Sequence, residues 1–289
     1  MSNYDRPASS WFEITELPVD KFGMVNPEDV RKAIKKETIL VSVIHASNEI
    51  GTIQPIAEIG KICHEKGVYF HTDASQSFGK VAIDVKKMNI DLLTASSHKI
   101  YGPKGAGVLF VKKGIILEPI LHGGGQENGM RGSTVNLPAI VGFAKATEIS
   151  LKPARNAAHS AAGGENARLT RLRNKLIKEV LKIKGSHLTG HPKNRLPNNA
   201  SFWFEFVEGE ALIMRLDLDC VACSTGSACS SFKLEPSHVL LATGLKPQEA
   251  HGSLRVSLGR QTTEKEINQL IKILPGIVKK IREISPYGK

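Results

Sequence analysis

The stretch of sequence that decides the fold is VYFHTDASQSFGKVAIDVKKMNIDLLTASSHKIYGPKGAG, residues 68 to 107. It contains two short apolar runs, residues 68–70 and 91–95, which are typical of buried strands. Polar residues follow each run, at positions 71–76 after the first and 96–99 after the second. Since ligands bind where the strands of an α/β sheet end, this stretch predicts the place of a site as well as a fold.

Two residues of this stretch suit one cofactor. Asp73 stands at the end of the first predicted strand, and Lys99 follows the second strand, beside the glycine-rich residues 102–107. Pyridoxal phosphate needs a lysine amine for its Schiff base and a carboxylate that keeps its pyridine nitrogen protonated. Each residue also has an ordinary explanation, Asp73 as a turn or helix-cap residue and Lys99 as a solvated lysine. The two together favour a pyridoxal phosphate site.

The alternation of strands and helices begins before this stretch. Residues 26–36 start with Asn, Pro and two acids, which indicates a capped helix. Residues 39–44 form an apolar run that is expected to be a strand buried on both faces. A helix that begins near Ile56 and stops at Gly67 then leads into the first quoted strand. This order predicts βαβ units and a mostly parallel sheet.

After the quoted stretch, residues 108–111 predict another strand and residues 138–149 predict a helix. Between them lies the glycine-rich segment of residues 122–134, which also carries Gln, Arg and hydroxyl side chains. Such a segment can present backbone N–H groups to an anion. The segment is therefore a candidate anion-binding loop.

The C-terminal half has a different pattern. Strands are expected at residues 200–206 and 254–258. Helices are expected at residues 168–184, which have one apolar side, and after the capping box of residues 263–266. Two strands and two long helices are typical of a small α+β domain.

The composition near residue 150 predicts a domain boundary. Residues 151–167 are rich in Pro, Ala and Gly, as linkers and exposed loops are. We therefore expect a large α/β cofactor-binding domain over residues 1–150 and a small domain over residues 151–289.

Composition and charge exclude several classes of protein. No apolar run approaches the roughly 20 residues of a membrane helix, and the first residues do not resemble a secretory signal. The net charge is +11, but Lys and Arg are scattered in short pairs along the chain. Scattered charge is typical of solvated faces, so we expect no nucleic-acid partner and no membrane, and an acidic protein or anionic substrate instead.

The cysteines are the second chemical feature. Cys220 and Cys223 form a CxxC pair, which is typical of zinc or of a redox dithiol, but no second pair of ligands stands elsewhere. Cys229 lies in a run of Ser, Gly and Ala that cannot bury it, as expected for a reactive thiol, whereas Cys63 lies on the apolar face of a predicted helix. This spacing is not a disulfide framework, so a reducing cytoplasm is expected.

Four motifs carry a resemblance to a known family: HTDASQSFGK at residues 71–80, SSHKIYGPKGAG at 96–107, STGSACSS at 224–231 and LRVSLGR at 254–260. Together they resemble the NifS/IscS-like cysteine desulfurases. The resemblance implies the aspartate-aminotransferase-like fold, fold type I of the pyridoxal phosphate enzymes. It covers nearly the whole chain, roughly residues 16–286.

The resemblance also implies residue roles. The residues implied to bind the cofactor are Lys99 as the Schiff-base lysine, Asp73 at the pyridine nitrogen, Gln76 and Asn48 at the ring hydroxyl, Ser96 and His98 at the phosphate, and Thr134 from the other subunit of a dimer. The residues implied to act on the substrate are Cys229, the thiolate that becomes a persulfide, and Arg255 and Asn48 at the carboxylate. His98 is counted with Lys99 and Cys229 as catalytic. The turn before Thr134 departs from the family because Gly132-Ser133 stands where Ser-Gly is usual.

The leading hypothesis is thus a cytoplasmic, homodimeric, pyridoxal 5′-phosphate-dependent cysteine desulfurase. It would take sulfur from L-cysteine, release L-alanine and pass the sulfur from Cys229 to an iron–sulfur scaffold protein or another acceptor in thio-cofactor assembly. No resident metal is expected, although Cys229 can ligate a cluster transiently with a scaffold partner.

Three alternatives stay open. The first is a catalytically weak desulfurase remnant that carries sulfur or binds a partner, and the second is another fold-type I enzyme, such as a selenocysteine lyase or an aminotransferase. The third is a redox or zinc module on Cys220 and Cys223. Family members also carry a preceding segment of roughly a hundred residues, with a phosphate loop and a stacking histidine, which nothing here matches. We therefore expect cofactor binding about ten- to a thousandfold weaker than in a full-length relative, and an apolar sheet surface that lacks part of its cover.

Overall fold

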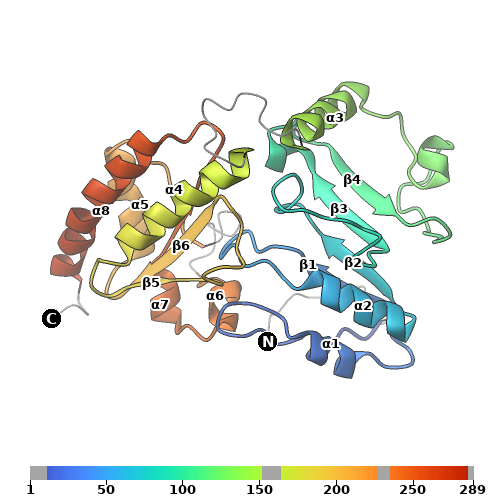
Figure 1. Ribbon diagram of the computed structural model, residues 1–289, viewed down its shortest axis with the longest axis horizontal. Helices are drawn as coiled ribbons and strands as arrows, with labels where there is room; N and C mark the ends of the chain where they lie inside the picture. Colours follow the sequence, from blue (N-terminus) through green and yellow to red (C-terminus); the bar gives the residue numbers. More distant parts are fainter. Residues whose placement is uncertain (1–11, 152–163, 227–234, 286–289) are drawn as a thin grey trace.

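Two β-sheets organise the chain (Figure 1). The computed structural model describes residues 12–151, 164–226 and 235–285. The first sheet has the strand order β1-β2-β3-β4, and its strands are β1 Leu40–Ile44, β2 Tyr69–Asp73, β3 Leu92–Ser96 and β4 Gly107–Val111. β1, β2 and β3 are parallel, whereas β4 runs antiparallel to β3. The prediction of an α/β fold with a mostly parallel sheet is confirmed.

Three helices accompany this sheet: α1 Pro27–Ala33, α2 Ile56–Lys66 and α3 Leu137–Leu151. Two short 3-10 helices, η1 Ser97–Ile100 and η2 Gln126–Gly129, lie in its loops. α1 begins as the sequence predicts, because the Asn26 side chain accepts the N–H of Glu28. α2 ends at Gly67, whose φ of 69° is the left-handed conformation that glycine adopts without steric cost.

One face of the first sheet is covered. Phe70 of β2 and Ala95 of β3 pack with Ile59 and Cys63 of α2 in a single buried cluster. The burial of Cys63 agrees with its predicted place on the apolar face of the helix. This helix-covered face is the large-domain core.

The other face of the first sheet is open. Leu40, Tyr69 and Leu109 are 45%, 50% and 47% exposed, and the strand register aligns Leu40 with Tyr69. The prediction that residues 39–44 are buried on both faces is therefore wrong. Among the residues that the structure describes, the helical cover lies over the opposite face, so alternate residues of β1 face solvent. This confirms the expected apolar sheet surface without full cover, which we call the open sheet face.

The second sheet is antiparallel, in the order β5-β6-β7. Its strands are β5 Ser186–Leu188, β6 Asn199–Phe204 and β7 Ser253–Ser257. Its helices are α4 Gly164–Val180, α5 Gly209–Leu218, α6 His238–Ala242, α7 Pro247–His251 and α8 Glu264–Ile284. The predicted capping box is present, since Thr263 and Glu266 each accept the backbone N–H of the other. This part is the expected small α+β unit.

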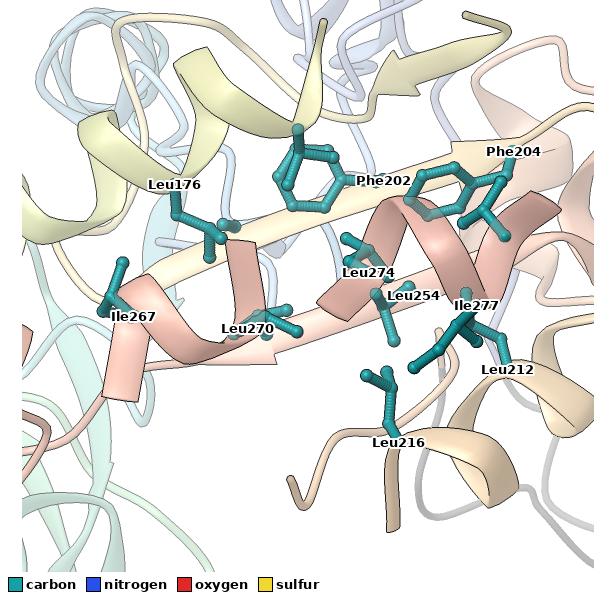
Figure 2. Close-up of a cluster of buried hydrophobic side chains, with 14 of the residues drawn as sticks. Leu176, Phe202, Phe204, Leu212, Leu216, Leu254, Ile267, Leu270, Leu274 and Ile277 are labelled. Atoms are coloured by element: carbon teal, nitrogen blue, oxygen red, sulfur yellow. The ribbon is translucent and has the colours of Figure 1, made fainter. Parts of the chain in front are cut away.

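The core of the small unit lies between its sheet and its helices (Figure 2). Phe202 and Phe204 of β6 meet the apolar stripe of α8, represented by Leu270 and Leu274. Leu176 of α4 packs on the same cluster. Full burial stabilises a side chain of this size by about 1.5–3 kcal/mol, so this cluster is large enough to fix α4 and α8 on the sheet.

The boundary predicted near residue 150 falls beside residues 152–163, which lie outside the described part of the chain. It stays a prediction. Within residues 12–151, 164–226 and 235–285, no helix has both the length and the apolar character required to cross a membrane.

Candidate functional site

The candidate site lies where the three parallel strands end. Register pairs Ile44 of β1 with Asp73 of β2, and Asp73 with Thr94 of β3. The segments that follow these strands therefore leave the sheet at the same edge. They carry Asn48, then Asp73 and Gln76, then the group from Ser96 to Lys99.

Asp73 is half-buried at the last position of β2. Its Oδ1 accepts the N–H of Ser75 at 2.8 Å, and the next amide, that of Ala74, donates to the carbonyl of Thr94 at 2.8 Å. The Asp73 carboxylate thus stabilises the turn after β2, which is the structural role expected of an Asp at a strand end. The same hydrogen bond fixes the direction of the carboxylate. The Asp73 carboxylate is a defined anionic group at the edge of the sheet.

Lys99 lies in the one-turn helix η1, directly after β3. Both Lys99 and His98 are exposed, and His98 Nδ1 lies 2.8 Å from the hydroxyl of Ser96. Gly102 closes this turn against Ser97, because a Cβ at Gly102 would lie 2.2 Å from the Ser97 hydroxyl oxygen. The Lys99 amine is accessible, and a larger residue at position 102 would displace the Ser97 hydroxyl.

A second lysine, which sequence reasoning did not select, lies beside this group. Lys80 donates from Nζ to the carbonyl of Gln76 at 2.9 Å. Burial, together with the charge of Lys99, lowers the pKa of Lys80 to about 8. No local pattern in the sequence marks Lys80, because only the packing of the chain buries it. The lowered pKa makes Lys80 a second candidate amine beside Lys99.

Two histidines of the first sheet are held neutral. His45 is 2% exposed, and burial lowers its pKa to about 4; its Nδ1 has no hydrogen-bond partner within the described part of the chain. His71 lies with Nδ1 2.8 Å from the Ser42 hydroxyl and Nε2 3.4 Å from the Thr94 hydroxyl. Burial lowers the pKa of His71, while the charge of Asp73 opposes the shift.

The small domain reaches this edge through Arg255. Its Nη1 donates to the carbonyls of Asn48 at 3.2 Å and Gly226 at 3.0 Å. The structure therefore brings together Arg255 and Asn48, the two residues predicted to bind the substrate carboxylate. Their distance in the sequence is 207 residues, and no local pattern could have shown the contact.

A buried arginine fixes the segment that carries Asn48. Arg195 is 3% exposed and donates from Nη2 to the carbonyl of Ile50 at 3.1 Å. Burial and the charge of Arg173 lower the pKa of Arg195 to about 9, so the guanidinium stays charged at neutral pH. Asn199 donates to the carbonyl of Glu49 at 3.1 Å. The segment after β1 is thus bonded to the small domain along its length.

Cys229 lies in residues 227–234, outside the described residues, but both flanks of that segment end at the site. Before it, the N–H of Gly226 donates to the Ser253 hydroxyl at 3.2 Å. After it, the Ser237 hydroxyl donates to the Glu49 carboxylate at 2.5 Å. Gly226 and Ser237, described residues on either side of it, thus contact residues that neighbour Asn48.

Thr134 is exposed on the segment before α3 and does not belong to the group at the strand ends. That Thr134 binds the cofactor of the other subunit in a dimer stays a prediction.

The CxxC alternative gains no support from the described residues. Cys220 is exposed, whereas Cys223 packs against the small-domain core and burial raises its pKa to about 11. No group of three or more His, Cys, Asp or Glu side chains able to hold a metal ion occurs within the described ranges. A zinc ligand set or a reactive dithiol would need two available thiolates.

The donor set at the edge of the sheet fits pyridoxal phosphate. It offers an accessible amine at Lys99, an oriented carboxylate at Asp73 and two hydrogen-bonding groups at Ser96 and His98. The buried Nδ1 of His45, which has no hydrogen-bond partner within the described residues, is a further polar group after β1. These are the chemical groups that a Schiff base, a pyridine nitrogen and a phosphate require.

Comparison with known proteins agrees with this chemistry. Residues 8–270 match the family model "Aminotransferase class-V". The "Cysteine desulfurase IscS" of Methanosarcina thermophila is 50% identical over 275 residues, which are 95% of this chain and 66% of that protein. A solved "NIFS-LIKE PROTEIN" superposes with a TM-score of 0.82 at 34% identity, over 93% of this chain and 69% of that one. The structure "SspA in complex with cysteine" has a TM-score of 0.70 at 36% identity, over 87% and 68%. The chain spans about two thirds of the length of these proteins.

Proposed function

Because the chain belongs to the class-V aminotransferase family, in which its relatives are cysteine desulfurases, we propose that it removes the sulfur atom of L-cysteine. The family consists of pyridoxal phosphate enzymes, so the cofactor is pyridoxal 5′-phosphate. The observation that carries the proposal is the meeting of Asp73, Lys99 and the Ser96–His98 pair at one sheet edge, with Arg255 bonded to the segment that carries Asn48.

The residues at the sheet edge have separate tasks. Lys99 would hold the cofactor through its amine, and the Asp73 carboxylate, oriented by the Ser75 amide, would face the ring nitrogen and favour its protonated form. Ser96 and His98 would hold the phosphate, and Gln76 would hold the ring hydroxyl. When bound, pyridoxal phosphate supplies an electron sink next to the substrate's α-carbon.

The substrate is held from the small domain. Arg255 pairs with the cysteine carboxylate, for which its forked guanidinium is well suited, and Asn48 orients the same carboxylate. The two residues are neighbours, since Arg255 donates to the Asn48 carbonyl. The related structure that contains cysteine supports the identity of this ligand.

Cys229 takes the sulfur. Its thiolate attacks the sulfur of bound cysteine, so a Cys229–sulfur bond forms while the bond between that sulfur and the substrate's Cβ breaks. The electron pair left on Cβ takes up a proton, and alanine is released. We assign this proton transfer to the group formed by Lys99 and its neighbour His98, because both are exposed at the same turn.

We also propose that the working form is a cytoplasmic homodimer that delivers sulfur to a scaffold protein or another acceptor. Exposed apolar side chains on and before α3 support an interface there, among them Ile116, which is 94% exposed, Ile120 and Leu137. Thr134 lies on the same stretch of chain. A second subunit packed there would bring Thr134 toward a neighbouring cofactor.

The experiment is a titration of the purified 289-residue chain with pyridoxal phosphate, followed by absorbance, with sulfide and alanine measured after addition of L-cysteine. A yellow protein that releases sulfide and alanine in equal amounts supports the proposal. Transamination without sulfide would instead favour an aminotransferase, and a preference for selenocysteine would favour a lyase. If the chain stays colourless at saturating cofactor, it does not bind pyridoxal phosphate, and the alternative of a sulfur carrier is favoured.

A further inference from the structure

Tyr101 has an unusual backbone conformation next to the proposed Schiff-base lysine. It follows the η1 turn that carries Lys99, and its φ and ψ of 67° and 17° lie in the left-handed region. A bulky residue rarely adopts this conformation, which is sterically unfavourable without glycine. Such outliers persist where surrounding contacts fix them, and they gather at functional sites. The contacts of Tyr101 therefore need an explanation.

Those contacts all reach the small domain. The Tyr101 hydroxyl accepts the backbone N–H of Arg260 at 2.7 Å, and the Arg260 guanidinium lies over the tyrosine ring, 5.1 Å from its centroid. Gly259 faces the same hydroxyl so closely that a Cβ there would lie 3.1 Å from it. The left-handed turn thus directs the Tyr101 side chain onto the segment that follows β7.

The first turn of α4 completes the junction. Glu165 accepts from Arg260 Nε at 2.7 Å, and Arg168 donates to the carbonyls of Thr262 at 2.6 Å and Arg260 at 2.8 Å. The Arg260 guanidinium thus has the Tyr101 ring against one face and the Glu165 carboxylate at its Nε edge. We call Tyr101, Glu165, Arg168 and Arg260 the Tyr101 junction.

The junction connects the two halves of the proposed site. Lys99 stands two residues before Tyr101, and Arg255 stands on β7, whose end leads directly to Arg260. On the opposite side, Arg255 bonds to the carbonyl of Asn48. The position of the carboxylate-binding arginine relative to the Schiff-base lysine is thus fixed from both sides.

We propose that Tyr101 and Arg260 are positioning residues, which hold Arg255 at the correct distance from Lys99 and so set the affinity for the amino-acid carboxylate. The inference rests on the proposed function. A positioning role and a purely structural role of Tyr101 predict different effects on stability and on substrate affinity. Tyr101 is 59% exposed, so removal of its hydroxyl should change the free energy of unfolding little while it weakens substrate binding.

The experiment uses the chain with Cys229→Ser, loaded with pyridoxal phosphate, so that bound cysteine is not consumed. L-cysteine is titrated while the cofactor absorbance is followed, with and without Tyr101→Phe, Arg260→Gln and the pair. Tyr101→Phe should raise the Kd for cysteine about three- to tenfold, as the loss of one net hydrogen bond predicts. Arg260→Gln keeps the backbone N–H that donates to Tyr101 but loses the guanidinium over the ring and the pair with Glu165, so it should also raise the Kd. The double variant should raise the Kd more than either single variant.

Matched controls separate positioning from general damage. Tyr69→Phe, on the open sheet face, and Arg31→Gln, whose guanidinium pairs with Glu65 inside the large domain, should leave the Kd for cysteine unchanged. Urea unfolding midpoints of Tyr101→Phe and of the parent chain should agree. A Kd for cysteine that is unchanged in Tyr101→Phe, or that changes only in proportion to a lost unfolding midpoint, overturns the inference.

A second measurement does not need the cofactor. In the apo-protein, hydrogen exchange of residues 253–258, which exclude the Arg260 amide, should become several-fold faster in Tyr101→Phe and stay unchanged in Tyr69→Phe. If the chain binds neither cofactor nor cysteine, the proposed function fails, and this exchange result alone decides whether the junction holds β7. Unchanged exchange in Tyr101→Phe contradicts the inference whatever the activity.

Discussion

Acid should destabilise the chain through His45, a buried histidine at the end of β1. Its backbone is fully engaged, because its N–H donates to the carbonyl of Asp73 at 2.8 Å and its carbonyl accepts from Gln54 at 2.8 Å. With 2% exposure it has no route to solvent, and burial lowers its pKa from 6.5 to about 4. The folded chain therefore holds a neutral His45 at pH values where the unfolded chain binds a proton.

The sign follows from proton linkage. Between pH 6.5 and pH 4 the unfolded state binds more protons at this position than the folded state, so stability falls as the pH falls through this window. One pKa unit corresponds to about 1.4 kcal/mol, so the loss from this one residue reaches about 2 kcal/mol at pH 5 and about 3 kcal/mol below pH 4. The pH dependence from this residue fades only above about pH 7.5, where the unfolded histidine is also neutral.

Urea unfolding at pH 7.5 and pH 5 measures this loss. Carboxylates also contribute to acid denaturation, so the relevant quantity is the difference between the wild-type chain and His45→Asn, which cannot titrate. His45→Asn should start less stable at pH 7.5 and lose about 2 kcal/mol less than wild type on going to pH 5. His64→Gln, at an exposed position of α2, is the matched control and should keep the full wild-type loss. Equal losses in wild type and His45→Asn would refute the reasoning.

Three further predictions concern the site. Borohydride reduction of the cofactor-loaded chain, followed by peptide mapping, should locate the phosphopyridoxyl group on Lys99. If a fraction of the label is found on Lys80 and that fraction grows above pH 8, Lys80 with its lowered pKa competes with Lys99 for the cofactor. Cys229→Ser should keep the yellow colour and release no sulfide from cysteine, whereas Cys223→Ser, at a partly buried position, should keep most of the activity; equal inactivity would favour a dithiol relay. Arg195→Met should lower the free energy of unfolding by about 3 kcal/mol in urea titrations, because it leaves buried carbonyls without hydrogen-bond donors. A loss below about 1 kcal/mol would contradict the role of Arg195 in fixing the segment after β1.

Local patterns in the sequence were sufficient for the elements that carry the cofactor residues. The β2 and β3 strands, the turn with Lys99 and the capping box of α8 each depend on residues within a few positions of one another. For the same reason Asp73 and Lys99 could be chosen before the fold was known. Parallel neighbours in a sheet bring their carboxyl ends together, so one topological rule turned two local motifs into one site.

The parts that the sequence did not show all depend on distant residues. The contact between Arg255 and Asn48 and the Tyr101 junction join segments that are more than a hundred residues apart. His45 and Lys80 have ordinary local surroundings in the sequence, and only the packed structure reveals their burial. The helices α5, α6 and α7 also escaped prediction, since α6 and α7 have five residues each and show no usable period.

The open sheet face has the most consequence for function. An apolar run indicates that a strand suits a protein core, but it does not show which elements cover each face of the strand. The sequence of residues 39–44 therefore predicted that both faces are buried, whereas alternate residues of β1 are exposed. The strand register places Asp73 on the same face as Leu40 and Tyr69, because Leu40 pairs with Tyr69 and Ile44 with Asp73. Exposed apolar surface costs about 25 cal/mol per Å², and the same solvent that reaches it also screens the charge of Asp73. Covering this face would therefore do two things at once, since it would stabilise the sheet and strengthen the interaction that we propose between Asp73 and a protonated ring nitrogen.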